Sequence, residues 1–227
     1  MPKITKSPIA YTATTATIIS TNIGTYMSTY LSSPYSRYRS HDYCHEVFVK
    51  NRKSVANPTT ADYMALNLYM FLASWGMVSR GKLLIQNNYK LLIDAVKVVC
   101  DEKYDWLVDV DIYNPGFSKA KYLDDVMQLK EDLRKAIYKT GIGYKYDDTL
   151  LSKIILATLG CVPAYDTNVK KTMRTFGITA SFNENGLKDL LDFANIYKSD
   201  IMTAMATYSG KTLVPYSPMR YIDMALW

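Results

Sequence analysis

Cysteine is scarce in this chain, with three residues, Cys44, Cys100 and Cys161, among 227. Such a small, odd and widely spaced set argues against a disulfide framework and favours a reducing compartment. It also excludes an iron–sulfur cluster held by four cysteines of this chain. Long apolar runs are missing as well, since no segment approaches the roughly 20 apolar residues of a membrane-spanning helix. We therefore expect a cytoplasmic protein without a membrane partner.

Histidine is rarer still, and both residues, His41 and His45, lie in the segment SRYRSHDYCHEVFVKNRK. Together with Cys44 and Glu46 they form a group of metal-ligating types, but no second group follows at a zinc-like spacing. We predict no bound metal and no other cofactor, and keep a metal-dependent nuclease built on this group as an alternative. The basic residues of the segment, interleaved with tyrosines, fit either a phosphate-binding path or a solvated face.

Basic residues outnumber acidic ones, 27 to 21, which gives a net charge of +6 and favours a polyanionic partner. The hydrophobic content of 48% is typical of a globular protein. A chain of 227 residues has the length of one large domain, or of two lobes that share a core.

Apolar residues recur at helical spacing through most of the chain, so we predict an all-α fold. The segment 59–77 is apolar nearly all round, which is typical of a buried central helix that begins at Thr59 or Thr60 and ends at Gly76. Further helices are expected at 82–99, at 118–141 after a Ser118 cap, at 148–159, 166–176 and 184–208, and from Pro218. The acid-rich segment 101–117 predicts a connection or a short strand pair.

A Gly-X-Gly turn, Gly141-Ile142-Gly143, joins two of the expected helices. Glycines permit a tight turn with positive φ and let the backbone approach a phosphate closely. The exposed N–H groups at the start of the next helix then point at the anion. The turn alone is a weak signal, because glycines end helices in many proteins. The residues C-terminal to the turn give it weight.

After the next helix come Leu159-Gly160, Pro163 and then AYDTNVKK, in which the lone carboxylate of Asp166 stands between an apolar helix and a basic one. This order of hairpin, helix, Leu-Gly step and an Asp that opens a helix resembles the helix–hairpin–helix DNA glycosylase superfamily of base excision repair. The Asp-X-Asn-Val-Lys order is most similar to its adenine glycosylase branch. The resemblance covers about 40 residues well, and the middle two-thirds of the chain by helix order.

The resemblance implies a two-lobed helical bundle in which Asp166 is the catalytic acid and Asn168 supports it. Some family members carry a Schiff-base lysine after the hairpin, and Lys145, which we include among the catalytic candidates, competes with Lys153 for that position. The insertion YKYDD lengthens the interval from hairpin to Asp. The cluster motif that several branches carry after the catalytic helix is missing. We expect a monofunctional enzyme.

The chemistry of such a site is set by the reaction. Breaking an N-glycosidic bond develops positive charge on the deoxyribose, which a nearby carboxylate stabilises while water is oriented for attack. A helix N-terminus favours the ionised form of Asp166. The alternative is that Asp166 is only an N-cap, a role for which Asp is well suited, and both roles are compatible.

Other residues are expected to hold the DNA. Lys170, Lys171 and Arg174 lie close together on one expected helix and are candidates for phosphate contacts, along with the hairpin residues Gly141, Ile142 and Gly143. An extruded base needs an apolar or aromatic slot. We place Trp75 there, with Tyr69 or Tyr63 as alternates, although a tryptophan in such an apolar helix also fits the core.

We predict a DNA glycosylase that releases a damaged, mismatched or hypermodified base, in repair or in defence against viruses with modified DNA. The expected organisation is an N-terminal segment 1–59, a lobe 60–177 that carries the hairpin and Asp166, and C-terminal helices 178–227 that pack with the N-terminal segment. A monomer associated with the nucleoid through DNA is expected. A non-catalytic helix–hairpin–helix DNA-binding module remains the alternative.

Overall fold

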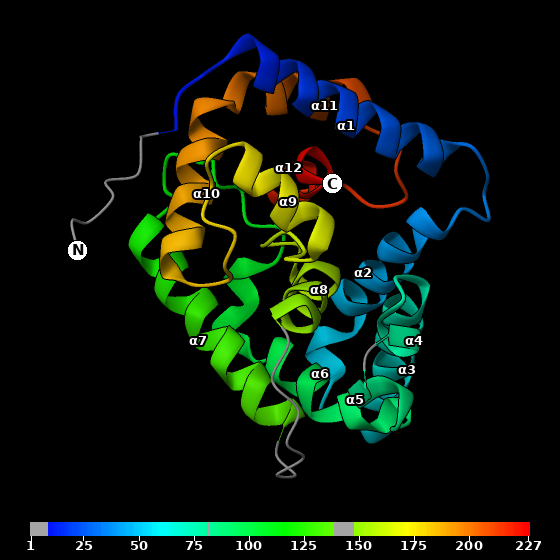
Figure 1. Cartoon of the computed structure of the whole chain (residues 1–227). Helices are drawn as coiled ribbons and strands as arrows, with labels where there is room; N and C mark the ends of the chain where they lie inside the picture. The colour runs from blue at the N-terminus through cyan, green and yellow to red at the C-terminus, as the bar shows by residue number, and fades with distance from the viewer. Residues whose placement is uncertain (1–8, 81, 139–147) are drawn as a thin grey trace.

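A computed structural model describes residues 9–80, 82–138 and 148–227. Every regular element in these ranges is a helix, so the predicted all-α fold is confirmed (Figure 1). The principal helices are α1 (Ala13–Leu31), α2 (Ser40–Asn51), α3 (Pro58–Ser74), α6 (Ile93–Val99), α7 (Lys119–Ile137), α8 (Asp148–Leu159), α9 (Thr167–Thr175), α10 (Glu184–Ile196), α11 (Lys198–Tyr208) and α12 (Pro218–Leu226).

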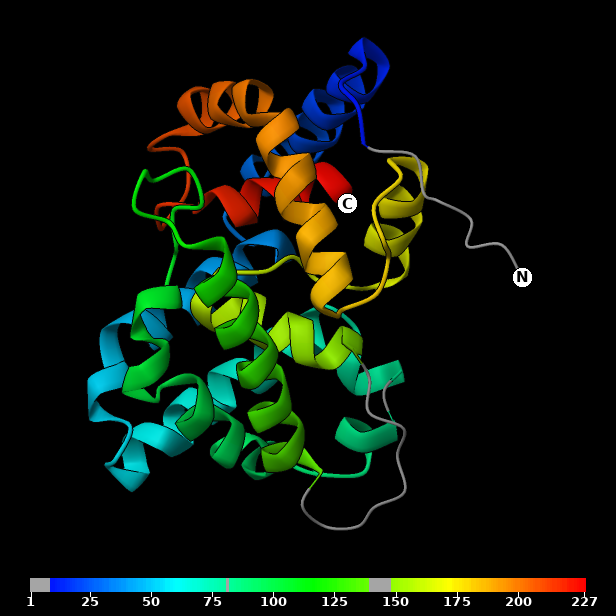
Figure 2. The ribbon, with the colours of Figure 1, turned by 90° about the vertical axis from the view of Figure 1, so that its left-hand side faces the viewer.

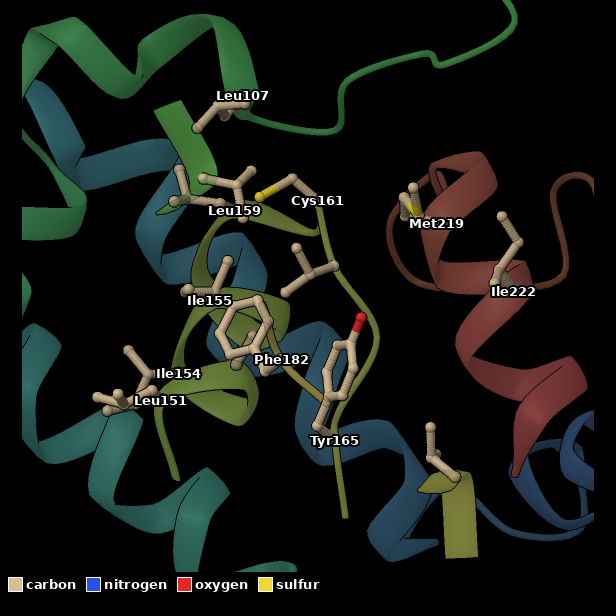
Figure 3. Packing of buried hydrophobic residues seen from close by; sticks show 14 of the residues in the cluster. Leu107, Leu151, Ile154, Ile155, Leu159, Cys161, Tyr165, Phe182, Met219 and Ile222 are labelled. Carbon is tan, nitrogen blue, oxygen red and sulfur yellow. The ribbon is translucent and has the colours of Figure 1, made fainter. Parts of the chain in front are cut away.

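Helix α8 lies at the centre of the molecule because its sequence is apolar on every side. All residues from Leu150 to Leu159 are buried, and α8 contacts α2, α3, α6 and α7. Figure 3 shows Leu151, Ile154 and Ile155 on this helix and the chain that leaves it past Cys161 and Tyr165, with Met219 and Ile222 of α12 on the other side of that chain. The core therefore surrounds the helix that leads into Asp166.

Helices from the two ends of the described chain lie side by side. Helix α1 packs against α11 and α12, and α11 packs against α12 (Figures 1 and 2). Helix α9 contacts α12 as well, and so it lies where this group meets the part of the fold built around α8.

Several helix boundaries differ from the expected ones because capping side chains decide them. Helix α3 begins at Pro58, after Asn57 accepts a hydrogen bond from the Thr59 amide, and neither Thr59 nor Thr60 is the N-cap. Ser118 caps α7 as expected. The expected helix 184–208 is two helices, α10 and α11, which meet at Tyr197.

Two further segments contain 3₁₀ helices, and the second of them is the connection that was one of its two expected structures. The expected helix 82–99 is divided into α5 (Lys82–Ile85), the 3₁₀ helix η3 (Tyr89–Leu92) and α6, because the Asn88 side chain caps η3. The acid-rich stretch forms a 3₁₀ helix, η4 (Glu102–Leu107), capped by Asp101, and no strand pair. Short polar side chains, Asn88 and Asp101, cap both 3₁₀ helices by bonding the local backbone, and in the segment 82–99 this interrupts the longer helix that was expected.

Removing side-chain volume from α8 should destabilise the protein strongly. Ile155 is fully buried, and Ile155→Ala is expected to lower the free energy of unfolding by about 2–5 kcal/mol, since it removes apolar contacts and leaves a cavity. The matched control is Ile85→Ala, at a side chain that is 61% exposed, which should change it by less than about 0.5 kcal/mol. Urea unfolding measures both, and equal effects would contradict a core centred on α8.

Candidate active site at Asp166

Helix α8 ends at Gly160 because the chain turns there with φ of 64°, a conformation that favours glycine. A Cβ at this position would lie 2.5 Å from Oδ1 of Asp109. The Gly160 carbonyl accepts a hydrogen bond from Oγ of Ser217 at 2.7 Å, and the Cys161 carbonyl accepts one from the Tyr122 hydroxyl at 2.6 Å. Distant side chains thus satisfy backbone groups that the end of the helix leaves unpaired.

The next residues are held in the same way. The Ala164 amide donates to Oδ1 of Asp223 at 2.8 Å, and the Tyr165 amide donates to Oγ of Ser152 at 2.8 Å. The Tyr165 carbonyl accepts from Oγ1 of Thr149 at 3.0 Å, and the Tyr165 ring stacks on Phe182 (Figure 3). Three side chains from α8 and α12 therefore fix the backbone up to the residue before Asp166.

Asp166 is the N-cap of α9, and its two carboxylate oxygens have different partners. Oδ1 accepts hydrogen bonds from the amides of Asn168, at 3.1 Å, and Val169, at 3.2 Å. Oδ2 lies 3.2 Å from Nζ of Lys153. The capping role is therefore real, and it leaves one oxygen beside a cation. Asn168 contributes its backbone amide to this arrangement.

Lys153 is buried, with 5% of its surface exposed, in the middle of α8, where its neighbours are mostly apolar. A charged side chain in such a position needs a partner, and Asp166 provides it. The structure thus brings Lys153 to Asp166. The competing candidate Lys145 and the hairpin residues Gly141, Ile142 and Gly143 lie outside the described residues, between the end of α7 and the start of α8.

An open cleft of about 670 Å³ begins at this ion pair. That volume is in the range typical of small-molecule sites. The residues that line it come from the chain before α2, from the end of α3 and the start of α4 (Met77–Arg80), from α8, from the start of α9 and from the C-terminus. They include Arg37, Trp75, Gly76, Thr149, Lys153, Asp166, Thr167, Asn168 and Trp227. Asp166 is therefore accessible from the cleft although its backbone is fixed by the core.

Trp75 forms an aromatic wall of the cleft. Two cations lie near its ring, the Arg37 guanidinium carbon at 5.3 Å and Nζ of Lys153 at 5.5 Å from the ring centroid. Tyr69, the second base-pocket candidate, packs against the core elsewhere on α3 and is not among the described residues that line the cleft, and Tyr63 is half exposed. Trp227 was missed, and Arg37 was a candidate only for a separate phosphate-binding path, since nothing local in the sequence connects either residue to Asp166.

A second buried charge pair lies behind the first. Arg220 and Asp223, one turn apart on α12, form an ion pair through Nη1 and Oδ2, and Nη2 of Arg220 donates to the Tyr26 hydroxyl. Burial raises the pKa of Asp223 above its usual range, while the charge of Arg220 opposes that rise. Asp223 also bonds the Ala164 amide, so this pair helps to hold the chain that carries Asp166.

Helix α9 leads from the cleft with basic side chains. Lys171 and Arg174 are exposed and Lys170 is partly exposed. None of the three forms an ion pair with another described residue, whereas lysines elsewhere, such as Lys50, Lys119 and Lys188, pair with carboxylates. The charge beside the cleft is therefore available to an anionic ligand.

The histidines belong to a buried polar network. His41 Nδ1 lies 3.3 Å from Oδ1 of Asp42, which also accepts from the Tyr216 hydroxyl, and His45 Nε2 lies 2.8 Å from Asp109. Burial lowers the pKa of His41 to about 4. Within the described residues, no group of three or more His, Cys, Asp or Glu side chains is arranged to hold a metal ion.

The comparisons with known proteins leave the site to be interpreted from its geometry. No family model, no curated protein and no solved structure matches this chain. Within the described ranges, no helix has the length and apolar character needed to cross a membrane.

The two groups of the buried ion pair should depend on each other. Asp166→Asn keeps an N-capping side chain but leaves the Lys153 ammonium without its partner, so we expect a loss of about 1–3 kcal/mol in the free energy of unfolding. Adding Lys153→Met should recover most of that loss, because no buried charge then remains unpaired. Urea unfolding of the single and double variants measures the coupling.

The control for this cycle is Asp192→Asn, which breaks an exposed pair with Lys119. It should cost less than about 1 kcal/mol, because solvent screens exposed pairs. If Asp166→Asn lowers the free energy of unfolding by the same amount with Lys153 and with Met at position 153, the two groups are not coupled.

Proposed function

We propose that this protein is a DNA glycosylase in which Asp166 promotes hydrolysis of the bond between a base and its deoxyribose. The observation that carries the proposal is the placement of Asp166 at the N-terminus of α9, beside the buried Lys153 and at the wall of a cleft that also contains Trp75. The order of motifs that resembles the helix–hairpin–helix glycosylases supports the same chemistry.

The reaction requires a fixed negative charge near C1′ of the deoxyribose. As the C1′–N bond breaks, its electron pair leaves with the base and positive charge develops on the sugar. The Asp166 carboxylate stabilises that charge and orients a water, whose oxygen bonds to C1′ while its proton leaves to the carboxylate or the solvent. The backbone amides on Oδ1 hold the carboxylate in place, so little reorganisation is needed during the reaction.

Lys153 supports this chemistry by its charge. An ammonium that is paired with a carboxylate has no lone pair with which to attack C1′. The pair therefore favours direct hydrolysis by water, as a monofunctional glycosylase performs it, over a lyase reaction through a Schiff base. Lys153 also keeps Oδ2 of Asp166 oriented toward the cleft when no DNA is bound.

The cleft suits a base taken out of the stack. Extruding a nucleotide costs on the order of a few kcal/mol, which stacking on an aromatic side chain helps to offset. Trp75 provides that side chain, and Arg37 adds positive charge at the cleft wall. Lys170, Lys171 and Arg174 continue that charge along α9 for the flanking phosphates. A monomer that acts on DNA in the cytoplasm or nucleoid, in repair or against modified viral DNA, is the biological setting that we propose.

Replacing the catalytic carboxylate should abolish base release. With Asp166→Asn we expect at least about a 100-fold loss of base release, because the amide carries no charge to stabilise the sugar cation. DNA binding should be unchanged or tighter. The assay incubates oligonucleotides carrying deaminated, alkylated, oxidised or glucosylated bases with the protein in EDTA, and alkali then cleaves abasic sites.

The same assay separates the alternatives. A non-catalytic binding module, which the N-cap geometry of Asp166 also fits, would bind these DNAs without producing alkali-sensitive sites. A nuclease that depends on a metal would cut without alkali and would lose its activity in EDTA. Matched Asp192→Asn protein, altered at an exposed carboxylate, should retain full base release.

Basic residues of α9 should contribute to binding through phosphates. Lys171→Gln and Arg174→Gln are each expected to reduce the slope of log affinity against log salt by about 1, because each removes one phosphate contact. Affinity should fall similarly for DNAs of different sequence. The control is Lys188→Gln, whose ammonium pairs with Glu184 on α10, and fluorescence anisotropy over a salt series provides the measurement. Unchanged slopes for both α9 variants would place the DNA elsewhere.

A further inference from the structure

A small cavity opens behind the cleft. It has a volume of about 20 Å³ and shares Trp75, Lys153, Asp166 and Trp227 with the cleft wall. A space of that size holds one water molecule or one oxygen-sized group, since about 10–15 Å³ is the minimum for a water. A base in the cleft would therefore place at most a single exocyclic atom in this cavity.

The buried charge pair of α12 forms the polar part of the cavity wall. Arg220, Asp223 and Tyr26 all line it, together with apolar side chains such as Phe71 and Leu156. Because Tyr26 and Asp223 are the two groups that bond the Arg220 guanidinium, the charged end of Arg220 lies at the cavity. Arg220 is 3% exposed, and its cation–π contacts with Tyr26 and Tyr216 hold the guanidinium plane.

The unused hydrogen-bonding groups of Arg220 indicate which ligand atoms this wall can bind. A guanidinium offers N–H donors at Nε and at both Nη atoms and accepts none. Only one bond from each Nη atom is formed, to Asp223 and Tyr26, and Nε has no acceptor among the described residues. Asp223 already accepts from Arg220 and from the Ala164 amide. The group of this pair that is left without a partner among the described residues is therefore a donor, Nε of Arg220.

The unused N–H donors of Arg220 distinguish two kinds of exocyclic group on a base. A carbonyl oxygen accepts a hydrogen bond from Arg220, whereas an amino group of the same size would set N–H against N–H and leave buried donors unpaired. Hydrolytic deamination changes the amino group into the carbonyl oxygen, as when adenine becomes hypoxanthine and cytosine becomes uracil. The ring itself is nearly unchanged in both cases.

We propose that the cavity at Arg220 is a specificity subsite that receives the exocyclic oxygen of a deaminated base. The subsite depends on the proposed function, since it selects which base lies beside Asp166. Arg220 donates to the oxygen, Asp223 and Tyr26 hold Arg220, and Trp75 stacks on the ring. Bases that carry an amino group at the same position bind weakly because the free donors of Arg220 then find no acceptor.

A binding experiment tests the subsite separately from catalysis. Asp166→Asn protein, which does not turn over substrate, is titrated with duplexes in which hypoxanthine or adenine stands opposite a tetrahydrofuran abasic analogue, so that both bases are equally unpaired. We expect about tenfold tighter binding to the hypoxanthine duplex, the size of one hydrogen bond to a charged group. A duplex with uracil should likewise bind more tightly than the same duplex with cytosine.

A variant of Arg220 identifies the donor. Arg220→Lys in the Asp166→Asn background keeps a cation for Asp223 but removes Nε and the planar donor set, so the preference for hypoxanthine should fall to within about twofold. The proposal is overturned if Asp166→Asn protein binds the oxo and amino bases with equal affinity in both comparisons. It is also overturned if Arg220→Lys leaves the ratio of the two affinities unchanged. If the Arg220→Lys variant does not fold, the two affinity ratios of the Asp166→Asn protein with Arg220 intact decide whether the proposal stands.

Failure of the subsite and failure of the proposed function give different results. If base release requires Asp166 but is equally fast for oxo and amino bases, the subsite proposal is wrong and the proposed glycosylase activity stands. Preferential binding of the oxo bases without release from any DNA would retain the subsite and argue against catalysis by Asp166.

Discussion

The ion pair between Lys153 and Asp166 is the interaction on which the candidate site depends. It couples α8, at the centre of the core, to the N-terminus of α9, and the Lys153 Nζ to Asp166 Oδ2 separation is 3.2 Å. A buried ammonium is costly without a partner, so Asp166 lowers the cost of burying Lys153 in the core around α8. The same pair holds a carboxylate at the wall of the cleft, which is the preorganised charge that the proposed electrostatic catalysis needs.

A second buried ion pair lies next to the first. Arg220 and Asp223 are buried behind Lys153 and Asp166, and Asp223 bonds the Ala164 amide in the chain that leads to Asp166. Buried pairs of this kind contribute little to stability compared with apolar residues of the same size. Their value here lies in position, since they fix a backbone that has no regular structure and place the Arg220 guanidinium at a cavity beside the cleft.

Much of the fold was predictable from local patterns, and the departures have local causes. The periodicity of apolar residues correctly predicted helices at α3, α7, α8, α9 and α12, because burial of an apolar face is encoded at short range. The boundaries at Asn57, Asn88 and Tyr197 were wrong or missed, because capping and 3₁₀ geometry depend on single side chains. The role of Asp166 as an N-cap was predicted, because Asp is well suited to that position and stands directly before a basic helix.

The sequence by itself determined that the chain is helical, that a basic helix follows a lone acid, and that Lys153 interrupts an apolar helix. Those features depend on neighbours within a few turns. Only the tertiary structure decided that Lys153 contacts Asp166, that Trp75, Arg37 and Trp227 line the cleft and Tyr69 does not, and that Arg220 lies behind it. These contacts join residues far apart in the chain, and the packing of α1, α3, α8 and α12 around one core sets their distances.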